Sequence, residues 1–84
     1  MAYRVILDEP VRAQLRDAPA QLQGYIDGIV AFLRADPTGA SVIFPVIASE
    51  DYRTIVFADG RGFLYYRVFE DRQVVVIVHL TWLG

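Results

Sequence analysis

The sequence of 84 residues contains no cysteine and no lysine, and its single histidine is His79. The absence of cysteine excludes disulfide bonds and thiolate metal sites, and a lone histidine excludes the standard zinc sites. The sequence has no Gly-rich phosphate loop, no nucleophile elbow and no carboxylate pair at a recognisable catalytic spacing. We therefore expect neither a metal nor another cofactor.

Long apolar runs are also missing. No run reaches the roughly 18 residues that would cross a bilayer, and the first residues enter a strand-like pattern instead of the apolar region of a signal peptide. The length suits one domain that spans residues 1–84. We expect a soluble, cytoplasmic, single-domain protein.

The charged residues have an unusual composition. All eight basic residues are arginine, and ten acidic residues bring the formal net charge to −2. A general phosphate-binding surface would give a positive balance, whereas arginine itself suits bidentate contacts to phosphate. A GC-rich genome also produces arginine without lysine, so the composition alone selects no class of partner.

The first half of the sequence begins with a strand and a short helix. Residues 3–7 alternate in polarity and include β-branched side chains, which predicts a strand. Asp8 is a helix-capping residue and Pro10 suits a first helical turn, which predicts a short helix over about residues 9–17.

A second helix follows Pro19 and is predicted to end within residues 36–39. Its apolar side chains recur with a helical period, at Leu22, Tyr25, Ile26, Ile29, Val30 and Leu33. Gly24 and Gly28 lie beside this stripe and weaken the helix. We expect the other helix to approach closely at these two glycines.

The second half is predicted to be β structure. In chain order it contains an apolar segment at 41–48, a strand at 52–57, a turn at 58–60 and a hairpin whose arms are 63–69 and 74–82. Pro45 makes the first segment an edge strand or an irregular lead-in, while the last arm is apolar on both faces and belongs inside the sheet. The order β-α-α-β-β-β predicts an α+β fold, with a two-helix hairpin packed on one face of a small, mostly antiparallel, four-stranded sheet.

One face of this sheet is predicted to bind another chain. Strict alternation in the last strand directs two sets of side chains to opposite faces: Val74, Val76, Val78 and Leu80 on one, Val75 and Ile77 on the other. Two helices can cover only one of these faces. The apolar surplus on the other face indicates a contact site for a partner or for a second copy of the chain.

Three residues on successive strands are candidates for catalysis: Arg53, Arg67 and His79. If Arg67 and His79 share a face, they can hold a phosphate and transfer a proton. The alternative is that His79 is a half-buried strand residue with a backbone partner.

Four further residues are candidates for RNA binding: Arg12, Arg16, Arg61 and Tyr65. An aromatic ring beside Arg67 on a strand suits stacking on RNA bases. The alternative readings are that a tyrosine of this strand packs in the core, that Arg67 pairs with a turn carboxylate, and that Arg12 and Arg16 belong to a solvated helix face.

The sequence resembles the RelE/ParE toxin superfamily over nearly its whole length. The motifs that carry the resemblance are Tyr3-Arg4-Val5, a helical hairpin ending in Asp36-Pro37, Tyr52-Arg53, and Tyr66-Arg67-Val68 followed by the run Val74–His79. The resemblance implies the toxin of a type II toxin–antitoxin pair. Members that resemble RelE cut messenger RNA in the ribosomal A site, members that resemble ParE act on DNA gyrase, and a protein antitoxin neutralises both.

Two positions depart from the RelE pattern. Phe63 stands where many RelE-like toxins have an arginine, and the segment 79–84 lacks the arginine and tyrosine that often follow the last strand. Two interpretations therefore stand. The first is a ribosome-dependent endoribonuclease in which Arg53 and Arg67 hold the phosphate and His79 assists proton transfer. The second is a non-enzymatic protein, either a gyrase poison or an inactive relative that only binds its antitoxin.

Overall fold

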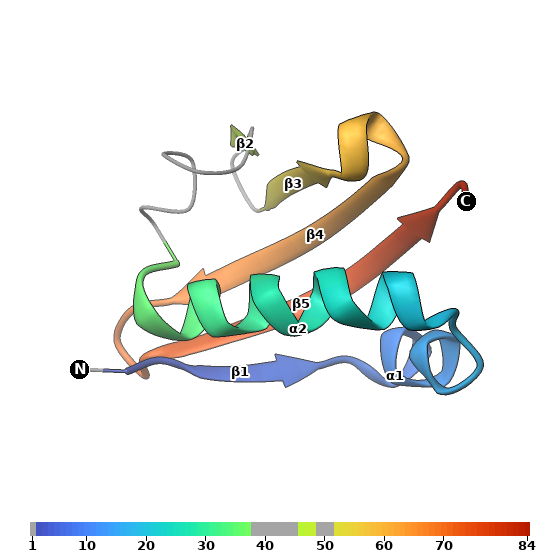
Figure 1. Ribbon diagram of the computed structural model, residues 1–84. Coiled ribbons are helices and arrows are strands. Elements are labelled where there is room, and N and C mark those ends of the chain that lie inside the picture. Colours follow the sequence, from blue (N-terminus) through green and yellow to red (C-terminus); the bar gives the residue numbers. More distant parts are fainter. Residues whose placement is uncertain (1, 38–45, 49–51) are drawn as a thin grey trace.

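The computed structural model describes residues 2–37, 46–48 and 52–84, which form one mixed sheet with helices on one side (Figure 1). The elements in chain order are β1 (Arg4–Leu7), α1 (Glu9–Arg16), α2 (Ala20–Ala35), β2 (Val46–Ala48), β3 (Arg53–Phe57), the 3-10 turn η2 (Ala58–Gly60), β4 (Gly62–Phe69) and β5 (Val74–Trp82). The predicted order of helices and strands is confirmed.

The strands lie in the order β1-β5-β4-β3-β2. β1 runs parallel to β5, and each of the other neighbouring pairs is antiparallel. β5 is an interior strand, as its two-faced apolar pattern predicted. A fifth strand, β2, adds to the four predicted strands at one edge of the sheet. It is short and forms the end of the apolar segment 41–48. The part of that segment from Ser41 to Pro45 lies outside the described residues.

The two helices begin where their sequence signals predict. The Asp8 carboxylate caps α1 by accepting a hydrogen bond from the Glu9 N–H at 3.0 Å. α2 starts after Pro19 and lies across the sheet (Figure 1). Its predicted stripe supplies much of the core: Leu22, Ile26, Ile29 and Leu33 are at most 4% exposed, and Val30 packs beside them. Among the described residues, no helix is long and apolar enough to cross a membrane.

The expectation that α1 approaches α2 at Gly24 and Gly28 is wrong. A Cβ atom added at either position would have nothing within 4 Å, and both residues are exposed. α1 lies near the N-terminal end of α2 and contributes Val11 to the core (Figure 1). The two glycines thus weaken the helix without a packing contact that offsets the loss.

Gly24→Ala should therefore stabilise the protein. Alanine is favoured over glycine in a helix interior by about 0.8–1.0 kcal/mol, and here its methyl group meets no neighbour. Gly28→Ala should act similarly, and the two changes should add to about 2 kcal/mol if they are independent. Thermal unfolding followed by circular dichroism measures the effect. An unchanged or lower Tm would show that α2 requires glycine for a reason other than space.

The strict alternation expected for β5 is also wrong, because the β4–β5 ladder contains a register shift. Tyr65 pairs with His79 and the next residue, Tyr66, pairs with Ile77, which leaves Val78 as an extra residue. A bulge of this kind reverses the faces of all residues that follow it. Leu80 therefore joins Val75 and Ile77 under the helices, where it is 3% exposed.

Candidate functional site on the open sheet face

The sheet face away from α2, here called the open face, carries the site. On β4, Leu64 and Tyr66 are fully buried on the helix side, whereas Tyr65 between them is 41% exposed. The pairing places the other side chains of the open face in four cross-strand rows: Val56, Phe63 and Thr81; Thr54, Tyr65 and His79; Tyr52, Arg67, Val76 and Ile6; Phe69, Val74 and Arg4. No aspartate or glutamate is among these residues, so this face is cationic although the whole chain is acidic.

The bulge at Val78 brings His79 to the open face. Without the extra residue, His79 would lie on the same face as Val75 and Ile77, which are buried under the helices. Instead it is exposed and pairs with Tyr65. The bulge therefore directs the only histidine of the chain to the face that carries Arg67.

The surroundings of His79 suit proton transfer. Its ring centroid lies 5.4 Å from that of Tyr65, and its Nε2 atom lies 3.2 Å from the Thr81 hydroxyl oxygen. Thr81 can donate to a neutral imidazole nitrogen or accept from a protonated one. Histidine is the usual general acid or base in proteins, and an exposed imidazole is accessible to a bound ligand. The alternative of a half-buried histidine is thereby excluded.

Arg67 lies over two aromatic rings of the open face. Its Cζ atom is 5.6 Å from the centroid of the Tyr52 ring and 5.0 Å from that of the Phe69 ring. Both distances fall within the range of about 6 Å at which a cation is attracted to a ring face. The edges of the planar guanidinium carry its N–H donors, which suit a phosphate or a carboxylate.

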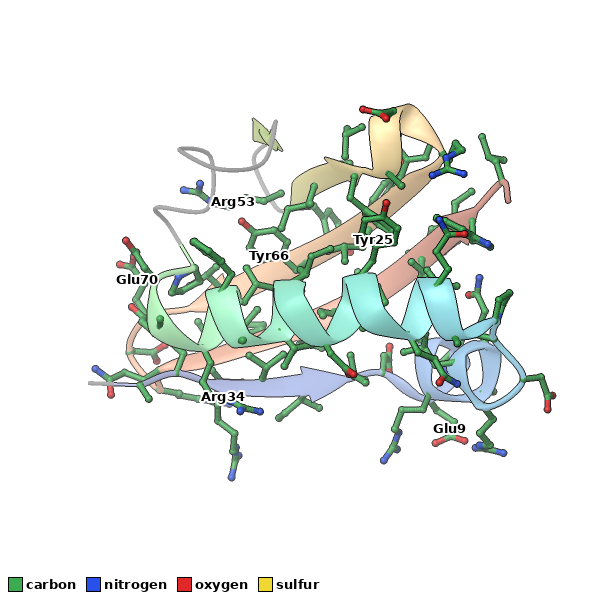
Figure 2. The ribbon with its side chains drawn as sticks, viewed as in Figure 1. Glu9, Tyr25, Arg34, Arg53, Tyr66 and Glu70 are labelled. Atoms are coloured by element: carbon green, nitrogen blue, oxygen red, sulfur yellow. The ribbon has the colours of Figure 1, made fainter. Side chains whose placement is uncertain are left out.

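Arg53 lies on the other face of the sheet. It pairs with Tyr66, which is fully buried and donates a hydrogen bond of 3.0 Å from its hydroxyl to the Pro37 carbonyl (Figure 2). Burial raises the pKa of the Tyr66 hydroxyl, and the charge and hydrogen bond of Arg53 act in the opposite direction. The structure thus brings Arg67 and His79 to one face and does not bring Arg53 to them.

Replacing Tyr66 with phenylalanine should destabilise the fold. The change removes the donor to the buried Pro37 carbonyl, which costs about 1–3 kcal/mol. The pKa of Tyr66 is higher in the folded protein than in the unfolded chain, where it is about 10. The contribution of this hydroxyl to the free energy of unfolding is therefore fully present below the unfolded pKa, and it is lost as pH rises through the folded pKa. Urea unfolding between neutral pH and pH 11 should show this alkaline loss in the native protein. If Tyr66→Phe has the same alkaline loss, the titration belongs to another group.

The remaining predicted RNA contacts lie away from the open face. The Cζ atom of Arg61 is 5.6 Å from the centroid of the Trp82 ring, and its Nε donates to the Ala58 carbonyl at 3.0 Å. On α1, Glu9 forms exposed ion pairs with Arg12 at 2.8 Å and with Arg16 at 3.0 Å, and it points away from α2 (Figure 2). Of the four RNA-binding candidates, the structure joins only Tyr65 to Arg67 and His79.

Three residues of this cluster were not among the predicted site residues: Tyr52, Phe69 and Thr81. Phe69 could have been found, since Phe63, Tyr65, Arg67 and Phe69 alternate along one strand. The positions of Tyr52 and Thr81 in the cluster depend on the register between strands, which short sequence patterns do not predict. Within the described residues, no group of three or more His, Asp or Glu side chains could hold a metal ion.

An apolar groove occupies the end of the open face next to Arg67. It has a volume of about 310 Å³ and is lined by Arg4, Ile6, Phe69, Arg72, Val74 and Val76. Within the described part of the chain, neither Arg4 nor Arg72 forms an ion pair with a carboxylate. The groove therefore combines an aliphatic floor with two uncompensated cations.

The fold and the open face define a small α+β protein whose exposed sheet surface carries cations and aromatic rings. Solved structures with a similar fold include RelE toxins. The archaeal RelE–RelB complex from Pyrococcus horikoshii OT3 contains a chain with a TM-score of 0.77 and 23% identity, over 100% of this chain and 98% of that chain. The isolated RelE toxin of E. coli has a TM-score of 0.78 and 16% identity, over 99% of this chain and 86% of that chain.

A third similar structure is the toxin–antitoxin complex RelBE2 from Mycobacterium tuberculosis, with a TM-score of 0.75 and 18% identity, over 98% of this chain and 99% of that chain. No family model matches the sequence. A search of curated proteins also gives no match. At these identities the likeness is one of fold, and the predicted RelE-like architecture is confirmed.

Proposed function

We propose that this protein is the toxin of a type II toxin–antitoxin pair and that it cleaves messenger RNA on the ribosome. The observation that carries the proposal is the convergence of Tyr65, Arg67 and His79 on one exposed sheet face. Arg67 would hold the scissile phosphate, His79 would transfer a proton, and Tyr65 would stack on a base. Arg53, on the opposite face, has no part in this assignment. The reaction would take place in the cytoplasm, where ribosomes and messenger RNA are found.

The fold supports the toxin assignment because the similar solved structures are named as RelE toxins and as toxin–antitoxin complexes. The local cationic character of the open face supports a nucleic-acid ligand despite the net charge of −2. The alternative is a non-enzymatic member that poisons DNA gyrase or only binds its antitoxin.

Purified protein mixed with ribosomes that carry a defined mRNA distinguishes these activities. We expect new mRNA ends, mapped by primer extension, when both the protein and the ribosome are present. A parallel assay of DNA supercoiling by gyrase tests the alternative. If no mRNA ends appear and supercoiling is inhibited, the gyrase assignment replaces the nuclease.

We also propose that the antitoxin binds the groove of the open face. An amphipathic segment with acidic residues would bury its apolar side against Ile6, Val74 and Val76 and place carboxylates beside Arg4 and Arg72. A second copy of the chain fits less well, because two copies of this cationic face would repel each other.

Ile6→Asp should prevent this binding. The new carboxylate would have to be buried in the apolar floor of the groove on complex formation, which disfavours binding. Leu83→Asp is a matched control, since Leu83 is 68% exposed and does not line the groove. Light scattering of each variant, alone and with the product of the neighbouring gene, gives the result. A complex that survives Ile6→Asp, or a native chain that ignores its neighbour and pairs with itself, would contradict the proposal.

A further inference from the structure

Two aromatic rings flank Arg67 from two directions along the sheet. Tyr52 comes just before β3 and is cross-strand from Arg67, while Phe69 lies two residues further along β4 on the same face. Tyr52 is 41% exposed and Phe69 is partly buried. Neither ring is part of the hydrophobic core under the helices.

This arrangement matters because a surface arginine usually samples many rotamers. Ordering such a side chain on ligand binding costs conformational entropy. Contacts between the guanidinium and two rings limit its motion before any ligand arrives, and they leave the in-plane N–H donors available. Preorganisation of this kind increases affinity without adding a contact to the ligand.

We infer that Tyr52 and Phe69 are positioning residues, which hold the guanidinium of Arg67 in place to receive an RNA phosphate. The inference rests on the proposed function, in which Arg67 contacts that phosphate. It differs from a second role that exposed aromatic rings can have, which is to stack directly on RNA bases. A positioning role requires Arg67, whereas direct stacking does not.

A double-mutant cycle separates the two roles. The probe is a fluorescein-labelled single-stranded RNA, and its affinity is measured by anisotropy at several salt concentrations. Tyr52→Leu and Phe69→Leu should each weaken binding by about 2- to 5-fold in the native background. In the Arg67→Ala background they should have no further effect, because the side chain that they position is gone. Undiminished losses in that background would overturn the inference and assign the rings to base stacking.

Matched variants provide the controls. Tyr52→Phe keeps the ring and should bind as the native protein does. Phe63→Leu removes a ring from the same face of β4 two rows away and should not change the coupling to Arg67. The logarithm of the RNA-binding constant falls linearly with the logarithm of the salt concentration, and the ring variants should keep the slope of this line. Arg67→Ala should make the slope shallower by about 0.7 for single-stranded RNA, because one phosphate contact is lost. Thermal unfolding of each variant confirms that it is folded.

A second measurement needs no RNA. The Arg67 side-chain resonances should show ring-current shifts in the NMR spectrum of the free protein, and these should decrease with Tyr52→Leu and Phe69→Leu. Arg61, over Trp82, is an internal reference whose shifts should not change. Absent shifts at Arg67 would overturn the positioning role. If the shifts are present but RNA does not bind, the proposed function fails and the inferred role in RNA binding fails with it.

Discussion

Arg67→Ala is expected to lower the rate of mRNA cleavage on the ribosome by about 10²–10³-fold, the usual loss when one preorganised donor to a developing negative charge is removed. Arg67 is partly exposed, its guanidinium lies over Tyr52 and Phe69, and it has no acidic partner among the described residues. It is therefore ready for a phosphate. Growth arrest on induction of the gene should disappear in the variant.

Arg34→Ala is the matched control for this change. It removes the same charge from the last turn of α2, the helix that lies on the opposite side of the sheet from the open face (Figure 1), and should leave growth arrest intact. Arg53→Ala tests the other predicted phosphate ligand. From its place on the helix side beside Tyr66, we expect an effect on stability more than on cleavage. A folded Arg53→Ala protein that cleaves as poorly as Arg67→Ala would restore Arg53 to the site.

His79→Ala distinguishes a role in proton transfer from the phosphate-binding role of Arg67. The loss of a general acid or base typically costs about 10²–10⁴-fold when proton transfer limits the rate, and less when another step is limiting. We expect His79→Ala to affect growth arrest less than Arg67→Ala does. If His79→Ala alone abolishes arrest while Arg67→Ala stays toxic, the phosphate assignment is wrong. If neither variant changes arrest, the nuclease proposal loses its residues and a non-enzymatic toxin takes its place.

The elements of this fold could be predicted because each has a local signal. The helical stripe from Leu22 to Leu33, the cap at Asp8 and the two-faced apolar run of β5 each depend on residues within one or two turns or one strand. The packing of α2 on the sheet follows from the same stripe, since its apolar face must be covered. The interior position of β5 was predicted from its two-faced apolar run.

The composition of the site could not be predicted in the same way, because it depends on register between strands. Arg53 and Arg67 occupy neighbouring strands, but the pairing of Arg53 with Tyr66 directs the two arginines to opposite faces. His79 lies on the open face because Val78 is an extra residue in β5, and no residue type near Val78 predicts a bulge. The absence of acidic side chains from the four described rows of the open face is likewise invisible in a net charge of −2.

Gly62→Ala is expected to destabilise the protein by about 3 kcal/mol, the upper part of the usual range for overpacking a core. A Cβ atom at this position would overlap the Cζ and Cε2 atoms of the Phe57 ring. Gly62 is paired with Phe57 on one side and with Trp82 on the other, and the two rings stack with centroids 6.0 Å apart and planes 11° apart. The glycine leaves the space that this stack occupies.

The Phe57 ring cannot move away cheaply, because Tyr25 of α2 contacts it at a centroid distance of 5.5 Å and also lies 6.1 Å from Trp82. A methyl group at residue 62 therefore disturbs the contact between helix and sheet, and it disturbs the surface on which Arg61 rests. Thermal unfolding should show a Tm lowered by roughly 12–24 °C. Gly24→Ala is the matched control with the opposite expected sign, since its methyl group meets no neighbour. A Gly62→Ala protein as stable as the native chain would mean that the aromatic stack can rearrange, and that the end of the sheet near Trp82 is not held by close packing.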